Sequence, residues 1–175
     1  TFHPVTTEGG SAKGQAAELV NALKEFPQIK FLATKANADA EGRIINKELE
    51  DYAAASSNLR LFPSLGMKRY LSALKYASFV IGNSSSGLVE APSFGIPTIN
   101  IGDRQKGRLK ATSVIDCPPE KQEIMKAIQK ALEQNKNITV INPYGDGNTS
   151  DKIVKIIMDK FVSGELFVRK SFVDR

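Results

Sequence analysis

Short apolar segments alternate with segments of helical periodicity along the chain, and this alternation constrains the fold more than any other feature. None of the apolar runs alternates between apolar and polar residues, which is typical of parallel strands buried on both faces. Strand and helix taking turns predicts right-handed βαβ units in an α/β fold, with a doubly wound, Rossmann-like parallel sheet. The predicted strands are residues 29–34, 59–62, 79–82, 98–101 and 114–116.

Apolar residues at three- and four-residue spacing define the helical segments, and each such stripe is expected to face the core. The five stripes are Ala16, Leu19, Val20 and Leu23; Ile45, Leu49 and Tyr52; Met67, Tyr70, Leu71 and Leu74; Ile124, Ala127, Ile128, Ala131 and Leu132; and Ile153, Ile156, Ile157 and Phe161. We predict one Rossmann-like domain over residues 1–162. Residues 163–175 form a C-terminal tail, expected to be helical and to pack on something outside this sequence. The opening residues read as the end of a strand, so we expect a piece of a longer protein.

Composition narrows the classes of function. The 175 residues include 41% hydrophobic and 25% charged residues, which suits one globular domain. The single Cys117 excludes a disulfide framework, and the single His3 argues against a histidine-built metal site. No apolar run approaches the length of a membrane span, so we expect a cytoplasmic protein with no membrane partner. The net charge of +5 permits an anionic ligand, and its interspersed pattern predicts no nucleic-acid partner.

Ligands of open parallel sheets bind beyond the carboxyl ends of the strands, and the polar, glycine-rich loops of this chain follow predicted strands. The strongest candidate is residues 82–92, where Ser84, Ser85 and Ser86 open a helical segment and could donate to phosphate oxygens. Glu90, about two turns further along, could accept both hydroxyls of a ribose. The alternative is that the serines only cap the helix and that Glu90 is solvated.

Other candidates lie in neighbouring loops, each with a simpler alternative. Arg104 could grip a diphosphate, or belong to a solvated basic run with Lys106, Arg108 and Lys110. His3 precedes Pro4 on the ligand edge and is weighed evenly between a structural and a functional role.

Leu65 could line a base pocket or pack in the core, and Asn37 and Asp39 could line the site or cap a helix. No P-loop lysine motif and no Gly-x-Gly-x-x-Gly fingerprint is present, so neither NAD nor FAD, and no other cofactor, is expected. No convincing pair of catalytic carboxylates is evident.

Residues 81–97, Ile-Gly-Asn-Ser-Ser-Ser-Gly-Leu-Val-Glu-Ala-Pro-Ser-Phe-Gly-Ile-Pro, resemble the UDP-N-acetylglucosamine 2-epimerase family. Four further blocks agree in order and spacing: residues 1–6, 37–40, 101–108 and 142–148. The resemblance extends to about Phe161. It implies a glycosyltransferase-B-type fold, in which two Rossmann-like halves face a cleft, and this chain resembles the C-terminal, UDP-holding half.

The resemblance also assigns roles by position. Ser84 and Ser85, with Ser86 beside them, would bind the diphosphate, and Glu90 the ribose hydroxyls. Arg104 and His3 would face the phosphates and the sugar end. Leu65 would border the uracil, and Asn37 would line the site. His3 is only a weak catalytic candidate, because the acid/base carboxylates are expected in the other half.

Two branches of the family differ in the first block and in the serine loop. In this chain the first block contains His3-Pro4, and the serine loop is Asn83-Ser84-Ser85-Ser86. Both resemble the hydrolysing, sialic-acid-pathway branch. That branch converts UDP-N-acetylglucosamine to N-acetylmannosamine and UDP by elimination to a glycal, and we expect this chain alone to be inactive. The implied partners are UDP-N-acetylglucosamine or UDP, an N-terminal domain and a second copy in a homo-oligomer. Alternatives are the donor-binding half of a glycosyltransferase-B enzyme and a stand-alone binding module.

Overall fold

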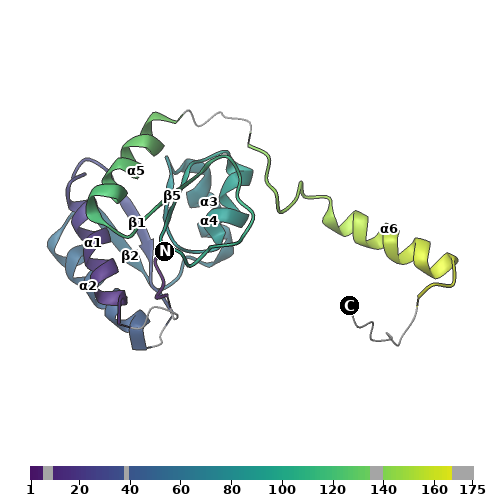
Figure 1. The fold of residues 1–175 in the computed structure, drawn as a ribbon, viewed down its shortest axis with the longest axis horizontal. Helices are drawn as coiled ribbons and strands as arrows, with labels where there is room; N and C mark the ends of the chain where they lie inside the picture. Colours follow the sequence, from purple (N-terminus) through teal and green to yellow (C-terminus); the bar gives the residue numbers. More distant parts are fainter. Residues whose placement is uncertain (6–9, 38–39, 135–139, 167–175) are drawn as a thin grey trace. The chain divides into compact units, whose positions relative to one another are not determined.

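The computed structural model describes residues 1–5, 10–37, 40–134 and 140–166, and it divides into two compact units, Thr1–Pro143 and Tyr144–Arg175 (Figure 1). The first unit contains β1 (Phe31–Thr34), β2 (Leu59–Phe62), β3 (Val80–Gly82), β4 (Thr98–Ile101), β5 (Val114–Cys117), α1 (Ala12–Lys24), α2 (Ala40–Ala55), α3 (Gly66–Tyr76), α4 (Ser86–Val89), the 3₁₀ helix η1 (Ala91–Phe94) and α5 (Lys121–Glu133). The second unit contains α6 (Thr149–Val162).

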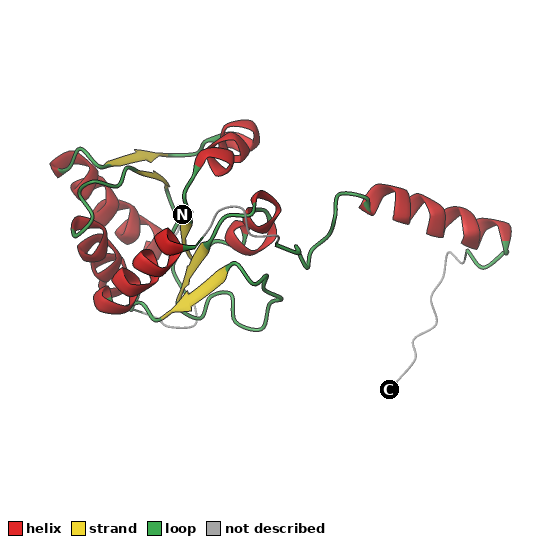
Figure 2. Ribbon diagram, turned by 90° about the horizontal axis from the view of Figure 1, so that it is seen from above, coloured by secondary structure: helices red, strands yellow, loops and turns green. Residues whose placement is uncertain are grey.

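All five predicted strands are present, and every strand pair is parallel, which confirms the α/β prediction. β2 and β4 have the predicted bounds, whereas β1 begins two residues later than predicted, β3 one residue later, and β5 extends one residue further. The described strands form two sheets, with the orders β1-β2 and β3-β4-β5. The N-terminus lies between these two groups of strands (Figure 2).

Helices cover both faces of the strands (Figure 1). α1 packs between α2 and α5, and α5 also packs on β4 and β5. α4 packs on β3 and β4, and α3 contacts η1. The main hydrophobic core joins the buried faces of α1, α2 and α5 to the strands, and a smaller core gathers Leu74, Ala91 and Ile96.

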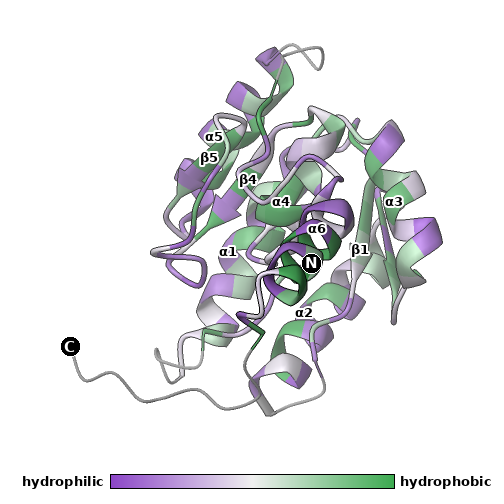
Figure 3. Ribbon diagram, turned by 90° about the vertical axis from the view of Figure 1, so that its right-hand side faces the viewer, coloured by the Kyte–Doolittle hydropathy of each residue, from purple (hydrophilic) through white to green (hydrophobic). Residues whose placement is uncertain are grey.

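The predicted stripes of α1 and α2 are buried throughout. In α5 four of the five residues are buried, but Leu132 is 47% exposed at the last turn. The α3 prediction is only partly correct, because Leu74 is buried while Met67 is 79% exposed. The α3 ribbon alternates between hydrophilic and hydrophobic colours along its turns, as an amphipathic helix does (Figure 3).

The helix predicted from Ile153, Ile156, Ile157 and Phe161 is present as α6, and within its unit every residue of this helix is exposed. α6 lies in the second unit, where the described residues supply no sheet or helix face to cover it. The predicted division at residue 162 stays a prediction, and most of the predicted tail, residues 167–175, lies outside the described residues. No helix in the described ranges is both long and apolar enough to cross a membrane.

Candidate functional site

The carboxyl end of β3 carries the loop that the sequence singled out, and it begins with a glycine that no other residue can replace. Gly82 has a φ of +140°, and a Cβ atom here would lie 2.1 Å from the carbonyl oxygen of Thr1. The following amide, that of Asn83, donates a hydrogen bond to the same oxygen at 3.3 Å. The N-terminal segment therefore lies directly against the start of the serine loop.

Asn83 holds this segment through its side chain, which is fully buried. Its Oδ1 accepts a hydrogen bond from the His3 amide at 2.7 Å, and its Nδ2 donates one to the His3 carbonyl at 2.8 Å. The amide side chain thereby satisfies both backbone groups of His3, as a neighbouring strand would. The structure thus places His3 at the serine loop, although the two segments are 80 residues apart in sequence.

The Asn83 carbonyl accepts two further hydrogen bonds, from Arg104 Nη1 at 3.1 Å and from Gln105 Nε2 at 2.7 Å. Gln105 is buried, whereas Arg104 is partly exposed to solvent. Burial lowers the pKa of Arg104 below its ordinary value of 12.5, and the positive charge of Arg108 acts in the same direction. The guanidinium stays charged at neutral pH, because arginine does not deprotonate in proteins.

The basic run that follows β4 divides into residues with different partners. Lys106 pairs with Asp103 at 3.0 Å, and Lys110 pairs with Asp116 at 2.8 Å. Arg104 instead directs one of its donors to the serine loop. Two lysines of this run are therefore paired locally, whereas Arg104 lies beside the serine loop and close enough to Arg108 to feel its charge.

The helix after the serines is much shorter than the sequence suggested. α4 is a single turn, and the chain continues as η1, where Pro92 lacks an amide donor and Gly95 ends the turn at a φ of +64°. Glu90 therefore lies at the junction of the two short helices, and its expected position two turns into one helix is wrong.

The capping alternative for the serines finds little support. Ser85 occupies the N-cap position of α4 without a side-chain capping bond, and the Ser86 amide and Ser84 Oγ lie 3.5 Å apart, at the outer limit of a hydrogen bond. The Ser85 hydroxyl is thus not used to close the helix.

Tyr70, Ser86 and Glu90 form a polar group beside this loop. The Tyr70 hydroxyl lies 2.6 Å from Ser86 Oγ. Burial raises the pKa of Tyr70 above its ordinary value of 10.0; the hydrogen bond with Ser86 opposes this shift and the charge of Glu90 adds to it. Within the described part of the chain, Glu90 Oε2 is buried and has no hydrogen-bond donor. An unpartnered buried carboxylate oxygen is costly and is a ready acceptor for a ligand hydroxyl.

Leu65 directly precedes α3 and lines a cavity of about 580 Å³ together with Tyr70, Ser84 and Ser86. The structure thus brings the predicted apolar residue to the same cavity as two of the predicted serines. Leu65 is neither buried in the core nor isolated on the surface.

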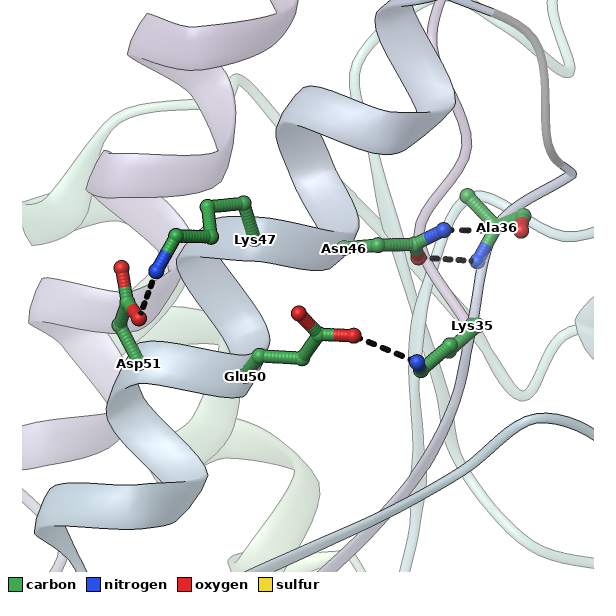
Figure 4. Close-up of polar contacts among 6 residues, drawn as sticks. All are labelled: Lys35, Ala36, Asn46, Lys47, Glu50 and Asp51. Atoms are coloured by element: carbon green, nitrogen blue, oxygen red, sulfur yellow. Dashed lines mark hydrogen bonds and ion pairs between the residues drawn. The ribbon is translucent and has the colours of Figure 1, made fainter.

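Asn37 is exposed and lies in the loop that follows β1. This loop is attached to α2 by Asn46, whose side chain accepts from the Ala36 amide at 2.8 Å and donates to its carbonyl at 3.2 Å, while Lys35 pairs with Glu50 (Figure 4). The predicted cap residue Asp39 lies outside the described residues.

Sequence reasoning missed three residues of this site: Asn83, Gln105 and Tyr70. Asn83 is part of the serine motif, and Gln105 is next to Arg104 in sequence. Nothing in the sequence indicates that either amide side chain will be buried and bonded to backbone groups far away in the chain. Tyr70 was counted only as part of a helical stripe. Among the described residues, no group of three or more His, Cys, Asp and Glu side chains is placed to hold a metal ion.

Comparison with known proteins identifies the family to which these residues belong. The family model described as UDP-N-acetylglucosamine 2-epimerase matches residues 1–158, which is most of the chain. The chain belongs to the UDP-N-acetylglucosamine 2-epimerase family. This membership confirms the predicted resemblance and favours it over the glycosyltransferase alternative.

Two curated relatives from bacteria are each 39% identical to the chain over 99% of its length. One is the polysialic acid biosynthesis protein P7 of Escherichia coli, and the other is the GDP/UDP-N,N′-diacetylbacillosamine 2-epimerase (hydrolyzing) of Campylobacter jejuni. The chain covers 45% of the first and 46% of the second, so it spans about half the length of the relatives that it matches.

Solved structures share the fold. A UDP-N-acetylglucosamine 2-epimerase homologue from Listeria monocytogenes superposes with a TM-score of 0.71 at 18% identity, over 99% of this chain and 47% of that one. The Methanocaldococcus jannaschii UDP-GlcNAc 2-epimerase, solved with UDP-GlcNAc and UDP, gives a TM-score of 0.67 at 18% identity, over 90% of this chain and 44% of that one. The predicted glycosyltransferase-B-type half-fold is thereby confirmed.

Proposed function

We propose that this chain is the UDP-binding half of a hydrolysing UDP-N-acetylglucosamine 2-epimerase. The observation that carries the proposal is the buried, unpartnered Oε2 of Glu90, next to the Tyr70–Ser86 pair. At the start of the same loop, Arg104 donates a hydrogen bond to the Asn83 carbonyl. An acceptor suited to a ribose diol and a cation suited to a diphosphate thus both lie close to the serine loop.

Each part of UDP finds a chemically matched group. A carboxylate accepts both hydroxyls of a ribose, which is the role we assign to Glu90. Hydroxyl donors and a guanidinium suit phosphate oxygens, and this role belongs to Ser84, Ser85 and Arg104, with Ser86 beside them. Because α4 is a single turn, these side chains contribute more than a helix dipole does.

The remaining predicted residues border the ends of the ligand. Leu65 supplies an apolar wall for the uracil at the cavity that it shares with Ser84. His3 and Asn37 lie at the ends of neighbouring segments and line the side on which the sugar projects. His3 is held through its backbone by Asn83, and we assign its ring to a sugar or phosphate oxygen.

The proposed reaction of the longer protein proceeds in two steps. In the first, the proton on C2 of the sugar leaves and the bond between C1 and the UDP oxygen breaks, which yields UDP and a glycal. In the second, water adds its hydroxyl to C1 and a proton returns to the opposite face of C2, which yields free N-acetylmannosamine. The UDP-binding half stabilises the departing diphosphate, and the carboxylates that move the protons belong to the other half.

Hydrolysis is favoured over reversible epimerisation by the serine loop, Asn83-Ser84-Ser85-Ser86, and by the name of the Campylobacter jejuni relative. The same relative makes a diacetamido-trideoxy sugar a substrate to test beside UDP-N-acetylglucosamine. With the longer protein in H₂¹⁸O, we expect ¹⁸O at C1 of a free 2-acetamido sugar. UDP-N-acetylmannosamine as the product, with no free sugar, would contradict hydrolysis.

Nucleotide binding is tested on the 175-residue chain by calorimetric titration with UDP and with 2′,3′-dideoxy-UDP. We expect the chain to prefer UDP, and Glu90→Gln to lose about tenfold or more in affinity for UDP but little for the dideoxy analogue. Glu133→Gln, at an exposed position at the end of α5, is the matched control and should bind as the parent chain does. Equal losses for both nucleotides in Glu90→Gln would contradict the ribose contact.

A further inference from the structure

The chain changes from an α-helical to a 3₁₀ conformation at Glu90, and this change leaves one backbone carbonyl without a helical partner. α4 ends at Val89, directly before Glu90, and η1 follows. In a 3₁₀ continuation the Val89 carbonyl would accept from residue 92, but Pro92 has no amide hydrogen. In an α-helical continuation it would accept from the Ser93 amide, which instead donates to the Glu90 carbonyl at 3.1 Å. The carbonyl next to Glu90 therefore needs a donor from elsewhere in the chain.

Asn142 supplies that donor from the segment that follows α5. Its Nδ2 lies 2.8 Å from the Val89 carbonyl oxygen and 2.7 Å from Ser93 Oγ. A carbonyl oxygen can only accept a hydrogen bond, so the nitrogen of the Asn142 amide must face it, which fixes the orientation of the side chain. These contacts span 53 and 49 positions of the sequence. One amide group thus holds both sides of the junction at which Glu90 lies.

The preceding part of α4 is held separately, by β4. The buried Thr98 hydroxyl donates to the Gly87 carbonyl at 2.8 Å. The two residues are in close contact, since a Cβ atom at Gly87 would lie 2.7 Å from Thr98 Cγ2. Thr98 therefore fixes α4 against the sheet, while Asn142 fixes its last residue. The backbone on both sides of Glu90 is held by contacts from other elements.

These contacts matter because a diol acceptor must be placed accurately. Hydrogen bonds weaken steeply as their angle departs from linear, so a carboxylate that accepts two neighbouring hydroxyls needs both of its oxygens in defined places. Glu90 Oε2 is buried and has no donor within the described part of the chain. α4 is a single turn, and a helix of that length has little stability of its own. The place of the Glu90 carboxylate is therefore set by the groups that hold the junction.

We propose that Asn142 is a positioning residue of the nucleotide site, which sets the place of the Glu90 carboxylate through the junction of α4 and η1. The proposal rests on the ribose role that the proposed function gives to Glu90. Both amide hydrogens of Asn142 are directed to this junction, one to the Val89 carbonyl and one to Ser93 Oγ, so Asn142 acts on the ligand through Glu90. Its effect is specific for the ribose hydroxyls and does not extend to the phosphates, which other side chains bind.

The alternative is that Asn142 only stabilises the fold. Asn142 is half-buried, and the loss of its hydrogen bond to the Val89 carbonyl would lower the stability of the chain in either case. The two roles differ in their effect on ligand selectivity. A purely structural residue changes the affinities for UDP and for 2′,3′-dideoxy-UDP equally, whereas a positioning residue lowers the preference for UDP.

The test repeats the two titrations on Asn142→Ala and Asn142→Asp. Asn142→Asp keeps the shape of the side chain and replaces the donating nitrogen with an accepting oxygen. We expect both variants to lower the preference for UDP over the dideoxy nucleotide roughly three- to fivefold, as the weakening of one hydrogen bond does. Asn21→Ala, which removes an acceptor of Lys24 in α1, is the matched control and should keep the preference of the parent chain.

A double variant and an exchange measurement separate positioning from general stability. Glu90→Gln/Asn142→Ala should bind UDP about as Glu90→Gln does, because a residue that acts through Glu90 has no further effect once the carboxylate is gone. Amide exchange tests the junction without a ligand. We expect the Glu90 and Ser93 amides, which both donate hydrogen bonds there, to exchange roughly tenfold faster in Asn142→Asp, with the Val80 amide of β3 unchanged.

Three results would overturn the positioning role: an unchanged preference for UDP in both Asn142 variants, a double variant that binds UDP several-fold more weakly than Glu90→Gln, or unchanged exchange at Glu90 and Ser93. If Glu90→Gln alone loses the preference, the proposed function stands and only the role of Asn142 fails. If Glu90→Gln keeps the preference of the parent chain, the ribose contact itself is contradicted, and the role of Asn142 fails with it.

Discussion

The Asn83 side chain binds the backbone of His3 on both of its polar groups, with Oδ1 accepting at 2.7 Å and Nδ2 donating at 2.8 Å. Its own carbonyl accepts from Arg104 and Gln105. One buried amide residue thus connects the N-terminal segment, the serine loop and the loop that follows β4. The relative positions of the predicted ligand-binding groups depend on this residue.

Replacing Asn83 should therefore destabilise the fold and loosen the site. Asn83→Ala removes the hydrogen-bond partners of the His3 amide and carbonyl at a partly buried place, which costs about 1–3 kcal/mol of unfolding free energy. Urea unfolding measures the loss. Gln129→Ala, which removes an exposed amide from α5, should stay within about 0.5 kcal/mol of the parent chain. Equal stabilities of the two variants would contradict the connecting role of Asn83.

Gly82 should tolerate no side chain. A Cβ atom at this position would lie 2.1 Å from the Thr1 carbonyl oxygen, and the φ of +140° is one that other residues rarely adopt. Gly82→Ala should cost about 2 kcal/mol or more and lower the yield of folded protein. Gly14→Ala, in α1 with open space around it, should instead stabilise the chain by about 0.5–1 kcal/mol. Opposite signs in thermal melts of the two variants are the expected outcome.

Arg104 should contribute to the affinity for the phosphates of UDP and little to the affinity for the nucleoside. Arg104→Lys keeps the charge but loses the planar donor pair, so we expect roughly tenfold weaker binding of UDP and a smaller preference for UDP over uridine. Calorimetric titration with both ligands measures this difference. Arg43→Lys, on the exposed side of α2, is the matched control. A variant that weakened UDP and uridine binding equally would place Arg104 away from the phosphates.

The 175-residue chain should lose stability as the pH falls from about 8 to about 6. The Thr1 amino group has its pKa lowered to about 6 by burial, from 8.0, so the folded state disfavours the protonated form. Above pH 8 the group is neutral in both states and costs nothing. Below that pH the unfolded chain binds the proton first, and the loss grows to on the order of 2 kcal/mol near pH 6.

Urea unfolding between pH 5.5 and 9 measures this dependence. The same chain with an acetylated N-terminus has no amino group to titrate and is the control. We expect the difference in unfolding free energy between the free and the acetylated chain to change over this interval and to level off below about pH 6. A constant difference would show that the amino group reaches solvent in the folded state.

Local patterns predicted the elements of this protein well. Apolar runs without alternation located all five strands, since a strand buried on both faces needs apolar side chains at successive positions. The stripe of α1 predicted its buried face, because residues at three- and four-residue spacing share one side of a helix. Serines and Arg104 in loops after strands predicted where polar side chains would gather, since parallel strands end at the same edge.

Long-range partners could not be predicted in the same way. Asn83 and Gln105 are ordinary polar residues in sequence, and their burial depends on hydrogen bonds to backbone groups that fold next to them. Glu90 was expected inside a helix, but Pro92 and Gly95 break that helix into two short turns. The apolar stripe of α6 has the same spacing as that of α1, yet α6 lies in a separate unit in which no other helix or strand is described.

The sequence by itself determined the class of fold, the strands, the helices and the family, because each is encoded in neighbouring residues or in ordered motifs. Only the tertiary structure decided that the described strands form two sheets, that Glu90 keeps a buried oxygen without a donor among the described residues, and that Asn83 connects the N-terminal segment, the serine loop and the loop that follows β4. The physical reason is that strand pairing and buried hydrogen bonds are made between residues far apart in the chain, and their energies depend on which groups the fold brings together.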